Sequence, residues 1–190
     1  MKKIIAMLLA ALMALGMVAC GAAEEATTTA PATTEAAITV GSAVEVLENV
    51  WALYNEETEK FFAMGGDFDA PVDNAPGAAT NAEWLEFSLL IPNAELANVT
   101  EAASLMHGMN ANTFTAGCYK VADVDAFAAT MQNAIQNNQW MCGFPENLYI
   151  ANVGGYCVVA FGLNDTMNVF KTHMAEAYPS AIELVNEAIG

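Results

Sequence analysis

Four cysteines are the most reactive side chains of this 190-residue chain. Cys20 closes an apolar N-terminal segment, whereas Cys118, Cys142 and Cys157 are spread through the rest of the sequence. None belongs to a C-x-x-C pair, the spacing typical of thiol-disulfide oxidoreductases. Three thiols permit one disulfide and one free thiol, so buried apolar cysteines, a structural disulfide and a reactive thiol all stay open. Cys118 and Cys157 fall in predicted strands and could be neighbours, and Cys142, just before Gly143, is the candidate for exposure.

Methionine and histidine form a second group. Met106, His107 and Met109 lie in one segment, and His173 with Met174 in another. Thioether, imidazole and thiolate are the ligands that Cu(I) prefers, so these residues could bind a soft metal if the fold joined the two segments. The alternative is that methionines at helical intervals simply fill a core.

A third group consists of Asp67, Asp69 and Asp73 in a segment rich in Gly and Pro. Several carboxylates on one segment can chelate Ca²⁺ through their oxygens. The spacing is not that of an EF-hand, because Val72 stands where the turn glycine belongs and Ala78 where the bidentate glutamate belongs. The alternative is a solvated acidic loop.

Motifs of known enzyme classes are missing. The sequence contains no G-x-S-x-G elbow, H-E-x-x-H pair, phosphate-binding loop or dinucleotide fingerprint. With two His and four Ser in the chain, few catalytic triads can be built. We therefore expect no cofactor and no catalytic site, and keep an extracytoplasmic hydrolase, with a His beside Ser or Asp, as an alternative.

The charge is strongly negative. Five Lys and no Arg stand against 22 Asp plus Glu, for a formal charge of −17. Nucleic acid is excluded as a partner, because binding a polyanion requires Lys and Arg to neutralise its phosphates. Anionic ligands in general are disfavoured, since the Arg fork that commonly recognises carboxylate or phosphate is missing.

The first 19 residues have the pattern of a secretory signal. Lys2 and Lys3 precede an apolar run over 4–15 that is too short for a membrane span. The residues Met17–Gly21 resemble the lipobox of bacterial lipoproteins, in which the signal is cut before a diacylated cysteine, here Cys20. This predicts a lipoprotein anchored to the outer face of the bacterial cell membrane. The alternative is an ordinary signal peptide with a fortuitous cysteine.

Behind Cys20, the Thr-, Ala- and Glu-rich stretch up to residue 37 has no large apolar side chain, so we expect residues 20–37 to be a disordered tether. Cleavage would leave three Lys and all 22 acidic residues, a formal charge of −19. Periodic apolar residues begin at Ile38, and we expect 38–190 to form a single domain.

Apolar spacing, capping residues and turns predict an α+β fold, with N-terminal helices followed by a β-α-β-β-α-α unit whose small sheet packs against helices. The stretch 65–80 has too many Gly and Pro residues for a regular element. In the hairpin around Gly154 and Gly155, both faces are apolar, so the hairpin should be central and covered on both sides. Helices are expected over 42–62, 81–89, 100–107, 123–135, 164–178 and from 179, and strands over 113–121, 148–153 and 156–161.

Three segments, Asn110–Gly117, Asn138–Glu146 and Asn164–Asn168, together with Phe61–Gly66, carry a resemblance. They are similar to a family of small lipoproteins of Gram-positive gut anaerobes that carry a domain of unknown function. Some of its members are labelled bacteriocin transport accessory proteins. The resemblance covers most of the chain after the tether and implies a small α+β fold on a cell-surface lipoprotein. It supplies no activity and no catalytic residues.

Three functional hypotheses follow. The first is a non-catalytic binding or accessory module whose acidic surface meets a cationic or neutral peptide or surface protein, although acidity can also serve solubility alone. The second is a thiol-redox or copper accessory protein using Cys142, Cys157, His107 and His173. The third is the hydrolase.

Overall fold

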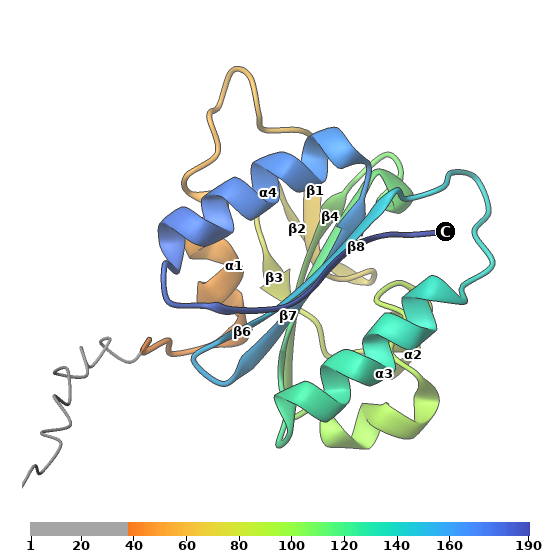
Figure 1. Ribbon diagram of the computed structural model, residues 1–190. Coiled ribbons are helices and arrows are strands. Elements are labelled where there is room, and N and C mark those ends of the chain that lie inside the picture. The colour runs from red at the N-terminus through yellow and green to blue at the C-terminus, as the bar shows by residue number, and fades with distance from the viewer. Residues whose placement is uncertain (1–37) are drawn as a thin grey trace, which may run out of the picture. The chain divides into compact units, whose positions relative to one another are not determined.

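The computed structural model describes residues 38–190, and one antiparallel sheet of eight strands runs through the middle of this part (Figure 1). The predicted signal peptide, Cys20 and the tether lie outside the described residues. Seven strands follow the order β2-β1-β4-β5-β7-β6-β8, and β3 pairs with β4. The strands are β1 (Ala63–Asp67), β2 (Ala70–Asp73), β3 (Gly77–Ala78), β4 (Glu101–His107), β5 (Phe114–Lys120), β6 (Asn147–Val153), β7 (Tyr156–Gly162) and β8 (Ile182–Ala188). The α-helices are α1 (Ala43–Trp51), α2 (Ala82–Phe87), α3 (Val124–Gln136) and α4 (Asn164–Ala177), and the 3-10 helices are η1 (Asn93–Asn98) and η2 (Ala111–Thr113).

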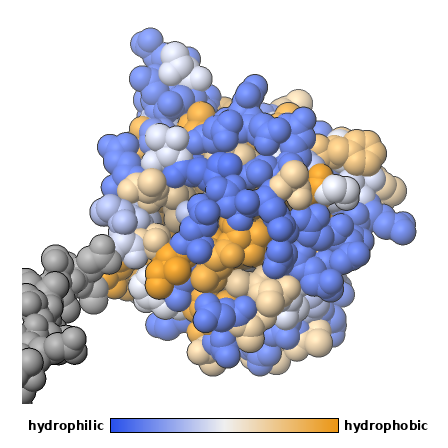
Figure 2. Space-filling model, viewed as in Figure 1, coloured by the Kyte–Doolittle hydropathy of each residue, from blue (hydrophilic) through white to orange (hydrophobic). Residues whose placement is uncertain are grey.

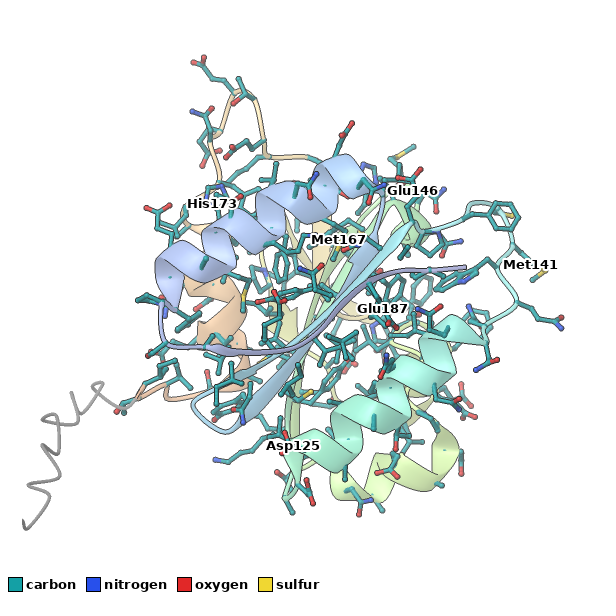
Figure 3. All side chains as sticks on the ribbon, viewed as in Figure 1. Asp125, Met141, Glu146, Met167, His173 and Glu187 are labelled. Carbon is teal, nitrogen blue, oxygen red and sulfur yellow. The ribbon has the colours of Figure 1, made fainter. Side chains whose placement is uncertain are left out.

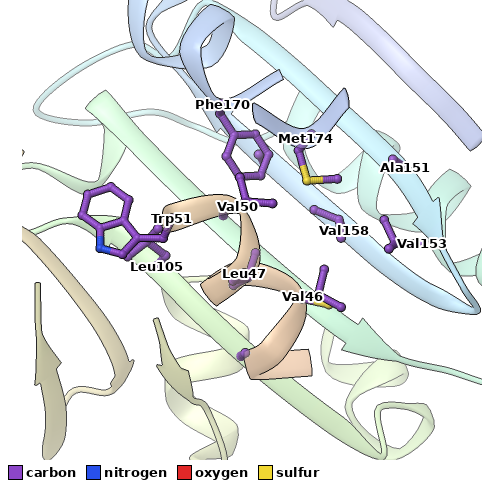
Figure 4. Close-up of a cluster of buried hydrophobic side chains, with 14 of the residues drawn as sticks. Val46, Leu47, Val50, Trp51, Leu105, Ala151, Val153, Val158, Phe170 and Met174 are labelled. Carbon is purple, nitrogen blue, oxygen red and sulfur yellow. The ribbon is translucent and has the colours of Figure 1, made fainter. Parts of the chain in front are cut away.

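Helices cover both faces of the sheet, which separates two hydrophobic cores. Figure 1 shows the sheet nearly edge-on, with α1 and α4 on one side and α2 and α3 on the other. In the first core, Val50 of α1 and Phe170 of α4 pack on Leu105 and Val158 of the sheet (Figure 4). In the second core, Met131 of α3 is fully buried. The α+β class is confirmed, but the sheet is larger than the small one expected.

The hairpin β6–β7 confirms the sequence pattern in detail. Gly154 and Gly155 have φ angles of 58° and 91°, the left-handed values that a two-residue hairpin turn needs. The hairpin lies between β5 and β8, and its two faces enter different cores. One face contributes Tyr149, Ala151, Val153, Tyr156, Val158 and Ala160, and the other contributes Leu148, Ile150, Cys157, Val159 and Phe161.

Side-chain caps start three helices where the sequence placed them. Ser42 accepts a hydrogen bond from the Glu45 amide at 3.1 Å, and Asp123 accepts one from the Ala126 amide at 3.0 Å. Asn81 accepts from two amides at the start of α2. Caps of this kind satisfy amides that have no partner inside the helix. α4 begins at Asn164, where the sequence predicted a helix to start, but it has no side-chain cap.

The N-terminal third was the least well predicted. The first helix ends at Trp51 instead of continuing to residue 62, and the stretch 65–80 contains three short strands. At Gly65 an added Cβ would collide with the backbone of Ala75 and Gly77, so glycine is needed there for close approach of two chain segments. The glycines therefore mark a tightly packed strand. The prediction that they interrupt regular structure was wrong.

Two predicted helices are strands. Residues 101–107, with Ala, Leu and Met as good helix formers, form β4 between β1 and β5, and the five middle residues are buried. Burial on both faces overrides helix propensity here. The segment from Pro179, also expected to start a helix, contains the edge strand β8, which pairs with β6.

The described residues begin at one end of the central hairpin. The Ile38 carbonyl lies against Gly154, so closely that a Cβ there would be 2.8 Å from its oxygen. Ile38 and Val40 then pack on the first core before α1 starts. Within 38–190, no helix has both the length and the apolar character needed to cross a bilayer.

Candidate functional site

The three described cysteines are free and do not converge. Cys118 pairs in register with Val158, one residue away from Cys157, so the two thiols point into opposite cores. Burial raises the pKa of Cys118 well above its ordinary value, and burial together with Asp125 raises the pKa of Cys157 to about 12. Only Cys142 is exposed, on the loop before β6. A Cys118–Cys157 disulfide is therefore not formed in this fold.

The histidines are held apart by an aromatic cluster. The ring of His107 stacks on Phe61 with a centroid distance of 5.1 Å, and the ring of His173 lies 4.9 Å from Tyr54. The rings of Tyr54 and Phe61 link the two histidines, and their centroids lie 6.4 Å apart. His107 Nδ1 accepts a hydrogen bond from the Met109 amide at 3.2 Å. The two imidazoles thus have structural partners and share no ligand position.

His173 has carboxylate partners of its own. Its Nε2 lies 2.9 Å from a Glu59 oxygen, and its Nδ1 lies 3.7 Å from a Glu176 oxygen. The methionines do not join it in a soft-metal cluster, because Met174 is buried in the first core and Met106 in the second. Met109 is exposed.

The three aspartates of residues 67–73 do not form one site, because only Asp67 is buried. The Asp67 side chain is buried and accepts hydrogen bonds from the amides of Thr80 and Asn81 and from the Thr80 hydroxyl, at 2.7 to 3.0 Å. Asp69 and Asp73 are exposed. Among residues 38–190, no three His, Cys, Asp or Glu side chains are grouped to hold a metal ion. Asp67 instead ties the β1–β2 turn to the start of α2.

A concave surface lies between α2, η2 and the loop that joins α3 to β6. We call it the α2 groove, and its volume is about 720 Å³. Its lining contains Glu83, Glu86, Phe87, Ser88, Leu90, Ala111, Asn112, Asn138, Gln139, Trp140, Met141 and Phe161.

Aromatic and apolar side chains form much of the groove. Trp140 packs on Phe161 with ring centroids 5.3 Å apart. Phe87 and Met141 are 83% and 78% exposed, although large apolar side chains gain free energy by burial. Figure 3 shows Met141 on the loop after α3, at the edge of the molecule. The indole Nε1 of Trp140 is buried and has no hydrogen-bond partner among residues 38–190.

The loop that borders the groove is fixed by asparagines. Asn110 donates to the Cys142 carbonyl at 3.0 Å, and Asn112 donates to the carbonyls of Met141 and Gly143 at 2.8 and 3.1 Å. Cys142 itself is held at a φ of 63°, a left-handed value that costs free energy for a residue with a side chain. Two of the segments quoted above, 110–117 and 138–146, therefore meet at this groove.

The groove is acidic. Glu83 and Glu86 line it, and no Lys does. The Lys residues of the described part of the chain have other partners: Lys60 pairs with Glu56, Lys120 lies over the Tyr156 ring, and Lys171 bonds to Asn147 and Asn186. Figure 2 shows a largely hydrophilic face with hydrophobic areas near its centre, where β8 crosses, and at its margins.

Sequence reasoning missed the groove residues Phe87, Trp140 and Met141. Phe87 could have indicated the groove, because Leu85 is the buried residue of α2 and Phe87 is therefore not needed for the core. Trp140 and Met141 stood inside a segment quoted for the resemblance, but nothing in the sequence told them from core residues. Comparisons with known protein families, curated proteins and solved structures find no match for this chain.

Proposed function

We propose that this chain is a non-catalytic binding module whose α2 groove takes a cationic amphipathic peptide or peptide segment of a partner. The observation that carries the proposal is the composition of the groove: exposed apolar side chains lie beside Glu83 and Glu86, with no Lys in the lining. Apolar anchors supply affinity when they leave water, and the carboxylates favour a partner with Lys or Arg.

The other two hypotheses lack such an observation. Neither His107 nor His173 lines the α2 groove, and the groove contains no His beside its one Ser. Of the three cysteines in residues 38–190, Cys142 alone is exposed, and no second cysteine is near it in the sequence. Peptide binding is favoured because it uses the residues that the groove actually presents.

We further propose that the module works outside the cell, held to the membrane by acyl chains on Cys20. The lipobox-like residues before and after Cys20 support this placement, and the acidic surface suits a soluble exposed domain. Growth with labelled palmitate should label the chain, and a Cys20→Ala variant should lose the label. Recovery of unlabelled protein from the cytosol with residues 1–19 attached would contradict it.

Binding is tested with a helical peptide that has a Leu face and a Lys face, titrated into the chain by calorimetry. The peptide should bind, its Glu-for-Lys counterpart should not, and affinity should fall with added salt because exposed charges are screened. Phe87→Ala should weaken binding about tenfold, within the range found for anchor residues.

Phe144→Ala is the matched control, because Phe144 is 73% exposed on the same loop as Met141 but does not line the α2 groove. Both substitutions should change unfolding free energy by less than about 0.5 kcal/mol, as is usual at exposed sites. Equal loss of affinity in the two variants, or equal binding of both peptides, would contradict the proposal.

A further inference from the structure

A second, smaller hollow adjoins the α2 groove. We call it the α2 cup; its volume is about 370 Å³, and it is lined by Phe68, Asp69, Asn81, Glu83, Trp84 and Phe87. Glu83 and Phe87 belong to both the cup and the groove. Three of the six side chains are aromatic and two are carboxylates.

Two of the three aromatic rings of the cup are largely exposed, whereas Trp84 is partly buried against the second core. Phe68 is 72% exposed and Phe87 is 83% exposed, while the neighbouring Leu85 is buried in the second core. Phe68 nevertheless has a defined place, since its ring lies 5.7 Å from the Trp84 ring at an angle of 38°. The buried Nε1 of Trp84 has no hydrogen-bond partner within the described residues.

The cup is held in shape by Asp67. Phe68 and Asp69 form the turn between β1 and β2, and the preceding Asp67 bonds to the amides of Thr80 and Asn81 at the start of α2. This contact joins the two chain segments that supply the aromatic rings. Binding to the cup therefore requires little ordering of its walls, and that lowers the entropic cost.

Aromatic faces and carboxylates attract the same kind of ligand. Each ring face carries a negative potential, which binds a cation with an apolar surface, most favourably a quaternary ammonium. Asp69 and Glu83 add negative charge at the rim, and no Lys lines the cup. Asp69 and Glu83 are the only carboxylates that line the cup, and no three His, Cys, Asp or Glu side chains among residues 38–190 are grouped to hold a metal ion. We propose that the α2 cup binds a quaternary ammonium ion.

The α2 cup is a site separate from the peptide-binding α2 groove, although the two share Glu83 and Phe87. A small cation tests it without any peptide, so failure of one proposal leaves the other standing. The probe is choline chloride, titrated into the full chain and followed by the indole NH signals in a ¹H–¹⁵N spectrum. The chain has three Trp, and the Trp84 signal is assigned as the one that a Trp84→Phe variant lacks.

Choline should move the Trp84 signal saturably with a dissociation constant in the range of about 1 to 10 mM, as expected for a small exposed site. The neutral isostere 3,3-dimethylbutan-1-ol should not move it. Phe87→Leu keeps an apolar side chain but removes the ring face, and should weaken binding about three- to fivefold, as should Phe68→Leu. Glu83→Gln should weaken it as well.

The matched control is Phe144→Leu, which removes an exposed aromatic ring outside the cup and should leave choline binding unchanged. These positions are exposed, so the variants fold, and their spectra verify it. A Trp84 signal unmoved by choline up to about 100 mM overturns the proposal, given the affinity expected above. It is overturned equally if the neutral isostere moves the signal as much as choline does.

Discussion

Asp67 offers the sharpest test of how this fold is built. Its carboxylate accepts from the Thr80 amide at 2.8 and 3.0 Å, from the Thr80 hydroxyl at 2.7 Å and from the Asn81 amide at 2.9 Å, and the residue is only 8% exposed. Hydrogen bonds to a charged group contribute about 1.5 to 3 kcal/mol each and are not additive. Asp67→Ala leaves three donors without their acceptor, so we expect a loss of about 3 to 4 kcal/mol. Asp67→Asn keeps one acceptor oxygen and should lose about half of that.

The assay is urea unfolding of the full chain at neutral pH, followed by circular dichroism. Asp69→Asn is the control, because Asp69 is exposed and two residues away, and its change should stay below about 0.5 kcal/mol. If Asp67→Asn were no less stable than Asp69→Asn, the carboxylate would not hold the β1–β2 turn to α2, and the preorganisation of the α2 cup would lose its cause.

The same contact predicts the direction of a pH effect. Burial opposes ionisation of Asp67, but hydrogen bonds from Asn81 and Thr80 outweigh it and hold its pKa below the ordinary value. The stabilisation is therefore fully present above the unfolded-state pKa, about 3.9, and is lost as the pH falls through the folded-state pKa. The wild-type chain should lose stability along this acid limb, and Asp67→Asn should lose less.

Three further predictions concern other parts of the fold. Iodoacetamide with peptide mapping should alkylate Cys142 in the native chain, whereas the two strand cysteines should react only after unfolding; fast reaction of all three would contradict their burial. Hydrogen bonds from the Asn55 backbone and from His173 lower the pKa of Glu59, so Glu59→Gln should flatten the fall of melting temperature below about pH 5, and an unchanged curve would show that this pair contributes nothing. Gly117→Ala places a methyl group against the buried Tyr119 ring and should cost about 1 to 3 kcal/mol in urea unfolding; a neutral result would mean that the ring moves freely.

Local sequence patterns predicted the second half of the chain because its elements agree with their own propensities. The β6–β7 hairpin combines alternating apolar residues with two glycines that suit the turn. Asp123 precedes a helix whose apolar residues all fall on one face. In contrast, β4 is a strand only because β1 and β5 lie on both sides of it, and its alanines and leucine carry no local sign of that.

The candidate site could be predicted only in part for a related reason. The sequence correctly marked Cys142 as the exposed thiol and placed the two strand cysteines in neighbouring strands. A one-residue offset sends those two thiols to opposite faces, and such an offset is visible only in the register. The α2 groove depends on segments far apart in the chain, such as those of Phe87 and Trp140, and the α2 cup joins the β1–β2 turn to α2, so spacing alone could not reveal them.

The contact between Ile38 and the Gly154 turn shows at which end of the central hairpin the described chain begins. β6 and β7 run from that turn to Asn147 and Gly162, seven residues each, so they span about 20 Å at 3.3 Å per residue. Phe161, at the far end of β7, forms part of the α2 groove. The residues before Ile38 therefore join the domain about one strand length away from the groove, so an anchor at Cys20, as proposed above, would be attached at the end of the sheet that the groove does not use.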